Sequence, residues 1–471
     1  KMRGTLQREA LRVSFLQGKL TAYHALLGIY LDRGDTQAAF AMAERAKSRT
    51  LADVISGSVE RRLQATLSAE QHQRLATLRA DLDALYNQLL DPTESDRGSH
   101  QRLHAQAIVL EREIAGLQGF DSPALRDATQ IQTQLPTNLP LVIYHLLDDE
   151  WLAFVYHADQ LQVVRQLGDR QTVHNLLTQL KSQWDRLRLG RAFITPHLAR
   201  FERSAKRVLA QLYTTLFAPL LDYLPTSGDL VIVPHGELHS FPFHALHDGQ
   251  HYLIDQFTIS YAPSATVLGL CEQQPYMRGG IVGVGSDSLG LAAVSAELTA
   301  LQNQFPSATI YARNAATIEQ VQQKTPQHGL LHIATHGLFR ADNPLFSALK
   351  LHDGWLTTRD IQKIQHVPTH VTLSACDSGR SSVMAGDETF GLSRAFLSIG
   401  VASLLVTQWL VQDEIAAALM KIWYAELDAG CNSADALRIA QIAIRDRFPH
   451  PYYWAPFVLI GRRHLSPTLT D

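Results

Sequence analysis

The sequence predicts an all-α N-terminal region followed by an α/β domain, in which helices cover both faces of a mainly parallel sheet. Residues 5 to about 120 contain one proline, Pro92, and carry apolar residues at helical spacing. From Leu230 onward, short strand-like runs alternate with helical runs, which is the pattern of an α/β domain. These strand-like runs are apolar at nearly every position, as expected for strands buried on both faces.

Length and composition indicate a globular protein with more than one core. The chain has 471 residues, and one domain usually holds about 100 to 200, so we expect two or three domains. Hydrophobic residues make up 46% and charged residues 18%, which argues against disorder over most of the chain. The formal charge of −3 provides no general basic surface, so we expect no direct binding to nucleic acid or to an anionic membrane.

Three cysteines, an odd number scattered along the chain, argue against a disulfide framework and for a reducing compartment. No apolar run approaches the roughly 20 residues that cross a bilayer, and the first residues lack the apolar core of a signal peptide. We therefore predict a cytoplasmic protein. Because Met is the second residue and the helical pattern begins almost at once, we also expect that sequence upstream of Lys1 is missing.

The helical region divides into two predicted units. In residues 1–60, large and small residues are spaced on either side of a turn at 32–35 as in a tetratricopeptide repeat, with an ordinary helical hairpin as the alternative. The spaced residues are Tyr23, Leu26, Tyr30, Ala39, Ala43 and Ala46. A lone repeat cannot bury both faces, so it should stack on neighbouring helices. Residues 61–135 carry two leucine-rich seams, which predict an antiparallel hairpin whose charged outer face is either solvated or bound to a partner.

Residues 134–140 form a plausible linker, after which the period changes to that of strands. A helical stretch is expected from about 171 to 222, interrupted near Gly190 and Pro196. A further helix is expected at 292–305. The predicted strands are 141–146, 151–156, 161–164, 230–233, 281–284, 330–334, 371–374 and 401–406.

Two of these strands end in residues that could carry chemistry. One runs into His336-Gly337 and the other into Cys376. The carboxyl ends of strands in open α/β sheets line ligand crevices, so both side chains could reach one substrate. A thiolate nucleophile needs a nearby base or cation, and an imidazole can then protonate the leaving amine. The amides of Gly337 and Cys376 could form an oxyanion hole.

Several sequence blocks surround this pair, namely 231–246 (VIVPHGELHSFPFHAL), 332–339 (HIATHGLF), 343–347 (NPLFS), 349–361, 372–379 (TLSACDSG), 386–400 and 451–461. Together they resemble the CHAT domain family, caspase-like proteases often fused to tetratricopeptide repeats and related in fold to separase and caspases. His336 and Cys376 lie 40 residues apart, comparable to the roughly 50 of caspases. The resemblance implies that both are catalytic and that residues 136–471 form the protease domain, with 136–325 as a pseudo-caspase part and 326–471 as the catalytic part.

The substrate pocket is expected near several further residues, namely Asp377, Ser378, Glu388, Trp409 and Asp413. Their acidic members would favour a basic residue before the cut. Alternatively, Asp377 caps a helix and Glu388 bonds loop backbone. The segment 406–409 reads Val-Thr-Gln-Trp where relatives usually have Ser-Leu-Trp, which leaves the shape of the pocket open.

Two other sites in the sequence are less well supported than the dyad. His235 and His239 are four residues apart, as zinc ligands on a helix are, but proline and glycine around them oppose a helix. We expect no metal and no cofactor. The glycine-rich run 279–285 lacks the ending of a phosphate loop and is better explained as a strand end and turn leading to the helix at 292–305.

The sequence thus predicts a cysteine endopeptidase that acts on a protein substrate, such as a pore-forming protein or another defence effector. A partner protein that binds the helical region would activate it, in bacterial defence or programmed cell death. The alternative is a non-catalytic scaffold whose caspase-like domain binds a partner without cutting it.

Overall fold

The computed structural model describes most of the chain from Ala128 onward and a part of the helical region before it. The described ranges are residues 22–47, 128–136, 138–187, 197–286, 292–338, 347–374, 382–384 and 388–466, with isolated positions between 51 and 110. Of residues 292–293, 382–384 and 388–390 only the backbone is described.

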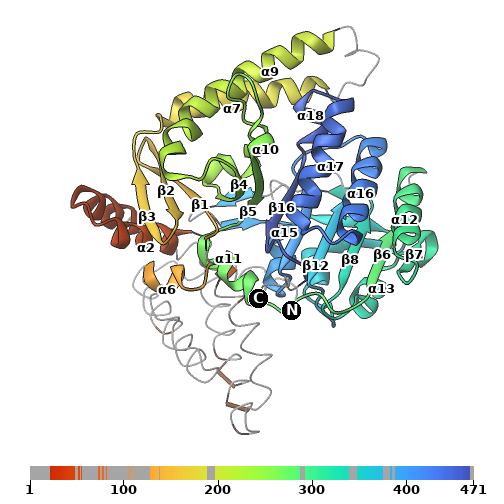
Figure 1. The fold of residues 1–471 in the computed structure, drawn as a ribbon. Helices are drawn as coiled ribbons and strands as arrows, with labels where there is room; N and C mark the ends of the chain where they lie inside the picture. The colour runs from red at the N-terminus through yellow and green to blue at the C-terminus, as the bar shows by residue number, and fades with distance from the viewer. Residues whose placement is uncertain are drawn as a thin grey trace, which may run out of the picture.

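An eleven-stranded sheet forms the centre of the molecule (Figure 1). Its order is β3-β2-β1-β4-β5-β16-β15-β12-β8-β6-β7, and only the pairs β3–β2, β2–β1 and β16–β15 are antiparallel. The β16–β15 pair therefore joins two parallel halves. The strands are β1 (Leu141–Leu147), β2 (Glu150–His157), β3 (Gln160–Val164), β4 (Gly228–Val233), β5 (Phe257–Tyr261), β6 (Ile281–Gly285), β7 (Thr309–Ala312), β8 (Leu330–Ala334), β12 (His370–Ser374), β15 (Ser403–Thr407) and β16 (Phe457–Gly461).

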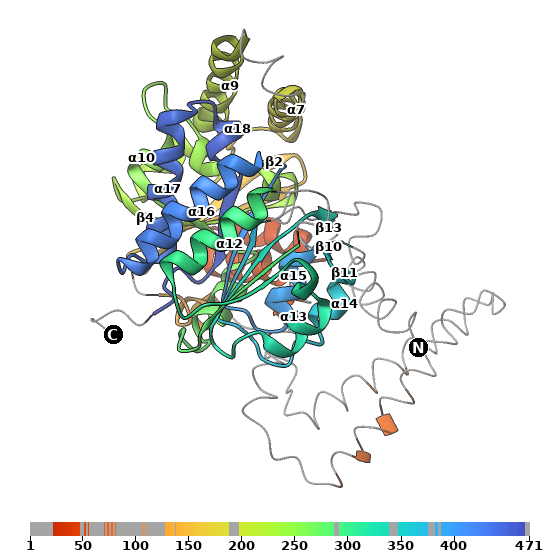
Figure 2. The same cartoon turned by 90° about the vertical axis from the view of Figure 1, so that its right-hand side faces the viewer.

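Helices cover both faces of the sheet, which confirms the predicted fold class (Figure 2). On one face α16 (Asp413–Asp428) packs against α12 (Ala292–Gln304) and α17 (Ser433–Arg447). On the other lie α13 (Ile318–Lys324), α14 (Thr358–Ile361) and α15 (Leu392–Ser398). Because of this cover, every residue of β8 and of β15 is buried.

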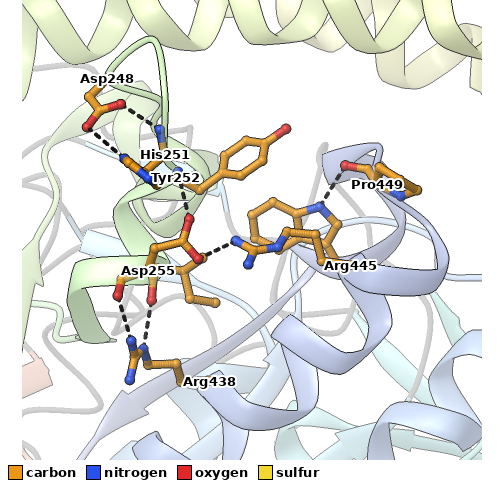
Figure 3. A network of polar contacts seen from close by, with 9 residues as sticks. Asp248, His251, Tyr252, Asp255, Arg438, Arg445 and Pro449 are labelled. Atoms are coloured by element: carbon orange, nitrogen blue, oxygen red, sulfur yellow. Dashed lines mark hydrogen bonds and ion pairs between the residues drawn. The ribbon is translucent and has the colours of Figure 1, made fainter.

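Further helices surround the half of the sheet that contains β1, β4 and β5 (Figure 1). They are α7 (Arg170–Leu187), α9 (Leu198–Leu212), α10 (Leu253–Gln256), α11 (Ala265–Glu272) and α18 (Pro451–Trp454), with a 3-10 turn η4 at Gly236–Ser240. Figure 3 shows how α17 is fastened to α10. Arg445 forms an ion pair with Asp255 at 2.7 Å, and Arg438 donates to the carbonyls of Ile254 and Asp255 at 2.7 Å each. No described helix is long and apolar enough to cross a membrane.

Glycines in β6 let α12 pack closely on the sheet. A Cβ added to Gly285 would lie 2.5 Å from Leu298 Cδ1 and 2.8 Å from Val294 Cγ1 of α12. Such distances are too short for carbon atoms, so a side chain there would push the helix away. The glycine-rich run therefore includes a strand, as predicted, and this strand also supports α12.

The predicted turn of the tetratricopeptide-like segment is confirmed between helix 22–32 and α2 (Thr36–Ala46). Asp35 caps α2 by accepting from the amide of Ala38 at 3.0 Å. Two of the predicted small positions, Ala39 and Ala43, are fully buried. The predicted hairpin at 61–135 lies largely outside the described residues, apart from α6 (Ala128–Gln132) and isolated helical positions.

Two buried charged residues fasten α2 to the α/β domain. The carboxylate of Glu44 accepts from the amides of Ala265 and Thr266 at 3.2 and 2.9 Å, at the start of α11. Lys47 Nζ donates to the carbonyl of Pro234 at 2.6 Å, just after β4. The helical segment thus makes direct polar contacts with two elements of the α/β domain.

Candidate active site

His336 follows the carboxyl end of β8, where the chain turns into a small second sheet. This sheet consists of β9 (Gly337–Leu338), β10 (Ala348–Leu351) and β11 (Gly354–Thr357), and it was not predicted. Thr335 donates its amide to the carbonyl of Ser374 at 3.3 Å, and its hydroxyl donates to the carbonyl of Lys350. These bonds fix the backbone just before the half-buried His336.

The amide of Gly337 points away from β10. Lys350 donates its amide to the carbonyl of His336 at 2.8 Å, so these residues form a hydrogen-bonded pair. The next pair is Gly337 with Leu349. Hydrogen-bonded and non-bonded pairs alternate in an antiparallel ladder, so β10 does not use the Gly337 amide. The Gly337 amide is therefore not used within its own sheet, as the donor of an oxyanion hole must be.

β12 ends beside β8 in parallel register. Ala334 pairs with Ser374, and these are the last residues of the two strands. His336 and Cys376 each lie two positions further along the sequence. Cys376, Asp377 and Ser378 are outside the described residues. Glu388 belongs to β14 (Glu388–Phe390), which pairs with β13 (Ser382–Met384), and its backbone alone is described.

Asp413, the first residue of α16, interacts electrostatically with His336. Partial loss of solvent around its carboxyl group raises the pKa of Asp413, and His336 lowers it. The negative charges of Glu297 and Glu414 raise it as well. The residue as a whole remains exposed, so the carboxyl group is accessible from solvent. Of the expected pocket residues, Asp413 is the one whose interaction with His336 the structure describes.

Trp409 lies beyond the end of β15 and is engaged with neighbouring helices. Its indole nitrogen donates to the carbonyl of Tyr452 in α18 at 3.0 Å, and its ring meets Trp184 of α7 edge-on at 5.4 Å. The preceding Gln408 donates to the carbonyl of His239 at 3.2 Å. The unusual Gln408 therefore links the segment before α16 to the η4 turn.

The two other cysteines are poorly suited to act as nucleophiles. Burial raises the pKa of Cys271 to about 12, so its thiolate is scarce at neutral pH. The pKa of Cys431 is also raised, first by partial desolvation and then by the neighbouring Glu426. Of the three cysteines in the sequence, Cys376 is therefore the candidate nucleophile.

A buried polar cluster beneath the site was not predicted. Glu297 of α12 accepts a hydrogen bond from Ser374 Oγ at 3.0 Å. His332 Nε2 is 3.2 Å from Glu297 Oε1, within ion-pair distance but not in line for a hydrogen bond. Tyr424 of α16 contacts His332 Nδ1 at 2.8 Å. The sequence signal that could have indicated this cluster is a polar residue, such as His332, inside an otherwise apolar strand.

His235 and His239 do not lie on a helix, although a zinc site with ligands four residues apart would need them to. His239 lies in the 3-10 turn η4, and His235 is the extended residue just before it. Among the residues that the structure describes, no three His, Cys, Asp or Glu side chains gather as metal ligands.

The fold and the site define an α/β domain of the caspase-like type. The imidazole of His336 follows the end of β8, which lies beside the end of its parallel neighbour β12. The chain belongs to the CHAT domain family, whose model matches residues 206–462. Two structures of the Saccharomyces cerevisiae separase–securin complex share the fold at 10% identity, with TM-scores of 0.52 and 0.50. They cover 84% and 95% of this chain, and 34% and 40% of the matched chains.

Two curated relatives are named as tetratricopeptide repeat proteins. Tetratricopeptide repeat protein 28 of Homo sapiens is 25% identical over 336 residues, and that of Mus musculus is 26% identical. Each alignment covers 57% of this chain and 14% of the relative, so the chain spans a small part of their length. Together with the helices at 22–46, these matches support a tetratricopeptide-repeat and CHAT organisation.

Proposed function

We propose that this chain is a cysteine endopeptidase that cleaves a specific protein with His336 and Cys376. The observation that carries the proposal is the parallel pairing of Ala334 with Ser374, which aligns the two strand ends that precede these residues. The thiolate of Cys376 would attack the scissile carbonyl carbon, and the Gly337 amide would donate to the resulting oxyanion. His336 would then protonate the departing amine.

A basic residue before the cut is part of the proposal. Asp413 carries a solvent-accessible carboxylate that interacts with His336, and Glu414 follows it at the start of α16. Negative charge at this edge of the site would attract a Lys or Arg side chain of the substrate. Trp409, Asp377, Ser378 and Glu388 are proposed to complete the pocket.

Activation through the helical region is supported by the contacts of α2. Lys47 bonds to Pro234, which precedes η4, and the His239 carbonyl of η4 accepts from Gln408. A partner that moves α2 could therefore displace the segment between β15 and α16. We place the protein in the cytosol, in a defence or cell-death setting, with a pore-forming protein or similar effector as the substrate.

New protein N-termini in a cell lysate test the proposal. Wild-type chain should generate them, whereas Cys376→Ala and His336→Ala should not, because each removes one member of the dyad. Cys431→Ala is the matched control and should cleave as wild type does. The residue before each new terminus reports whether a basic side chain is preferred. Equal numbers of new termini with wild type and Cys376→Ala would reject a peptidase and favour a scaffold.

A further inference from the structure

One buried carboxylate touches both strands that lead into the proposed site. Glu297 accepts from Ser374 Oγ at 3.0 Å, and Ser374 is the last residue of β12. Its other oxygen lies 3.2 Å from His332 Nε2, on β8 and four residues before His336. The side chains of Glu297 and His332 are only 5% and 0% exposed.

From His332 the polar contacts continue across the sheet. Tyr424 OH lies 2.8 Å from His332 Nδ1 and also bonds to the side chain of Thr372. Thr372 Oγ1 lies 3.0 Å from His370 Nε2, and His370 Nδ1 lies 3.0 Å from Ser403 Oγ. The chain of contacts therefore links β8, β12 and β15 to α12 and α16.

One set of donors is consistent with this chain of contacts. Burial lowers the pKa of His370 to about 3, so its ring is neutral and carries one N–H. If that N–H donates to Thr372, then Thr372 donates to Tyr424, and Tyr424 donates to His332 Nδ1. The remaining N–H of His332, on Nε2, then faces Glu297. The chain of contacts ends at Glu297, whose Oε1 lies 3.2 Å from His332 Nε2 without the alignment of a hydrogen bond.

A purely structural role explains this carboxylate poorly. Burying an ionised carboxylate costs several kcal/mol unless hydrogen bonds and charges offset the cost, and apolar residues of similar size often serve a core as well. The charge of Glu297 also reaches the edge of the site, because it acts on Asp413, which interacts with His336. Glu297 thus lies where it can affect the dyad in two ways, through the alignment of the ends of β8 and β12 and through its own charge.

We propose that Glu297 is a positioning residue, which holds the ends of β8 and β12 together and supplies negative charge at this end of the site. This inference rests on the proposed peptidase function. The fixed strand ends would keep the imidazole within reach of the nucleophile and the leaving group. The negative charge would favour the protonated imidazole that acts as the acid. Among the residues that the structure describes, Asp413 and Glu414 are further acidic groups at this end, and Lys350 pairs with His336 in the small sheet.

Glu297→Gln is the decisive variant, because it keeps the size of the side chain and removes its charge. We expect kcat to fall by about 10- to 100-fold, as for a misplaced catalytic group, with KM changed by less than about twofold. The His336 titration, followed by NMR of ¹³C-labelled histidine, should move to lower pH by about half a unit. Tyr424→Phe, which breaks the chain one residue further on, should lower kcat in the same direction by less.

Asp255→Asn provides the matched control for Glu297→Gln. It makes the same carboxylate-to-amide change and breaks the ion pair with Arg445, between α10 and α17 (Figure 3). It should lower the Tm without changing kcat or the His336 titration. Equal kcat losses in the two variants, or an unmoved His336 titration in Glu297→Gln, would overturn the inference.

The titration needs no substrate, so it separates failure of this inference from failure of the proposed function. If Cys376→Ala cleaved as well as wild type, the peptidase would be rejected while the titration still reported on Glu297. If Glu297→Gln did not fold, Tyr424→Phe would decide, and unchanged kcat and His336 titration in that variant would count against the network.

Discussion

At the scale of single residues, the two cysteines that the structure describes, Cys271 and Cys431, lie in environments that disfavour the thiolate. Cys271 is buried, and this raises its pKa to about 12. Cys431 is partly accessible but lies beside Glu426, whose negative charge opposes ionisation of the thiol. A peptidase with Cys376 as nucleophile should therefore show one reactive thiol and two slow ones.

Alkylation rates test this ranking. With limiting iodoacetamide at pH 7, Cys376 should react about tenfold or more faster than Cys431, because an adjacent imidazole would populate its thiolate. Cys271 should react only after unfolding. Peptide mass spectrometry at successive times measures all three rates in one sample. His336→Ala should slow Cys376 to the rate of Cys431, and similar rates for these two thiols in wild type would contradict an assembled dyad.

At the scale of elements, close packing of α12 on β6 brings Glu297 to the strand ends. Gly283 and Gly285 provide this closeness, because side chains there would meet Leu298, Leu301 and Val294. The glycine run is therefore part of the support beneath the proposed site.

Gly285→Ala should destabilise the protein by about 1 to 3 kcal/mol, as overpacking usually does, and should also lower kcat by displacing Glu297. Urea unfolding and peptide cleavage measure the two effects. Gly280→Ala is the matched control, because a Cβ there meets no atom within 4 Å. If both variants had the same stability, α12 would not depend on the glycines.

The sequence predicted most strands of the central sheet but omitted β5, β7 and β16. The limits of β8, 330–334, were predicted as observed. β5 was omitted because Thr258 and Ser260 interrupt its apolar pattern, yet every residue of β5 is buried. Thr258 donates to Asp435 of α17 at 2.7 Å, a partner 177 residues away that local pattern cannot show. Glu297 was missed for the same reason.

At the scale of the whole molecule, several histidines are buried in the neutral form. Burial lowers the pKa values of His244 and His450 to about 4 and that of His370 to about 3. In the unfolded chain the ordinary histidine pKa is about 6.5, so between pH 6.5 and 4 the unfolded state binds more protons than the folded state. Stability must therefore fall as the pH falls through this window.

Urea unfolding between pH 5 and 8 should show this loss, with each buried histidine contributing about 2 kcal/mol at pH 5 relative to pH 8. His450→Asn should make the dependence shallower by about one proton, because asparagine can still cap the start of α18, where His450 Nδ1 accepts from the Tyr452 amide at 3.1 Å. An unchanged slope in that variant would show that His450 is not neutral in the folded state.

The position of β16 has a consequence for how the protein is made. Residues 457–461 pair with β15 on one side and β5 on the other, so they close the gap between two half-sheets whose strands are synthesised earlier. Until those residues have left the ribosome, the edges of β5 and β15 have no partner strand between them. After β12 has been made, a nascent chain therefore holds the proposed catalytic strands in an unfinished sheet until β16 follows, which would delay proteolysis until translation has passed residue 461.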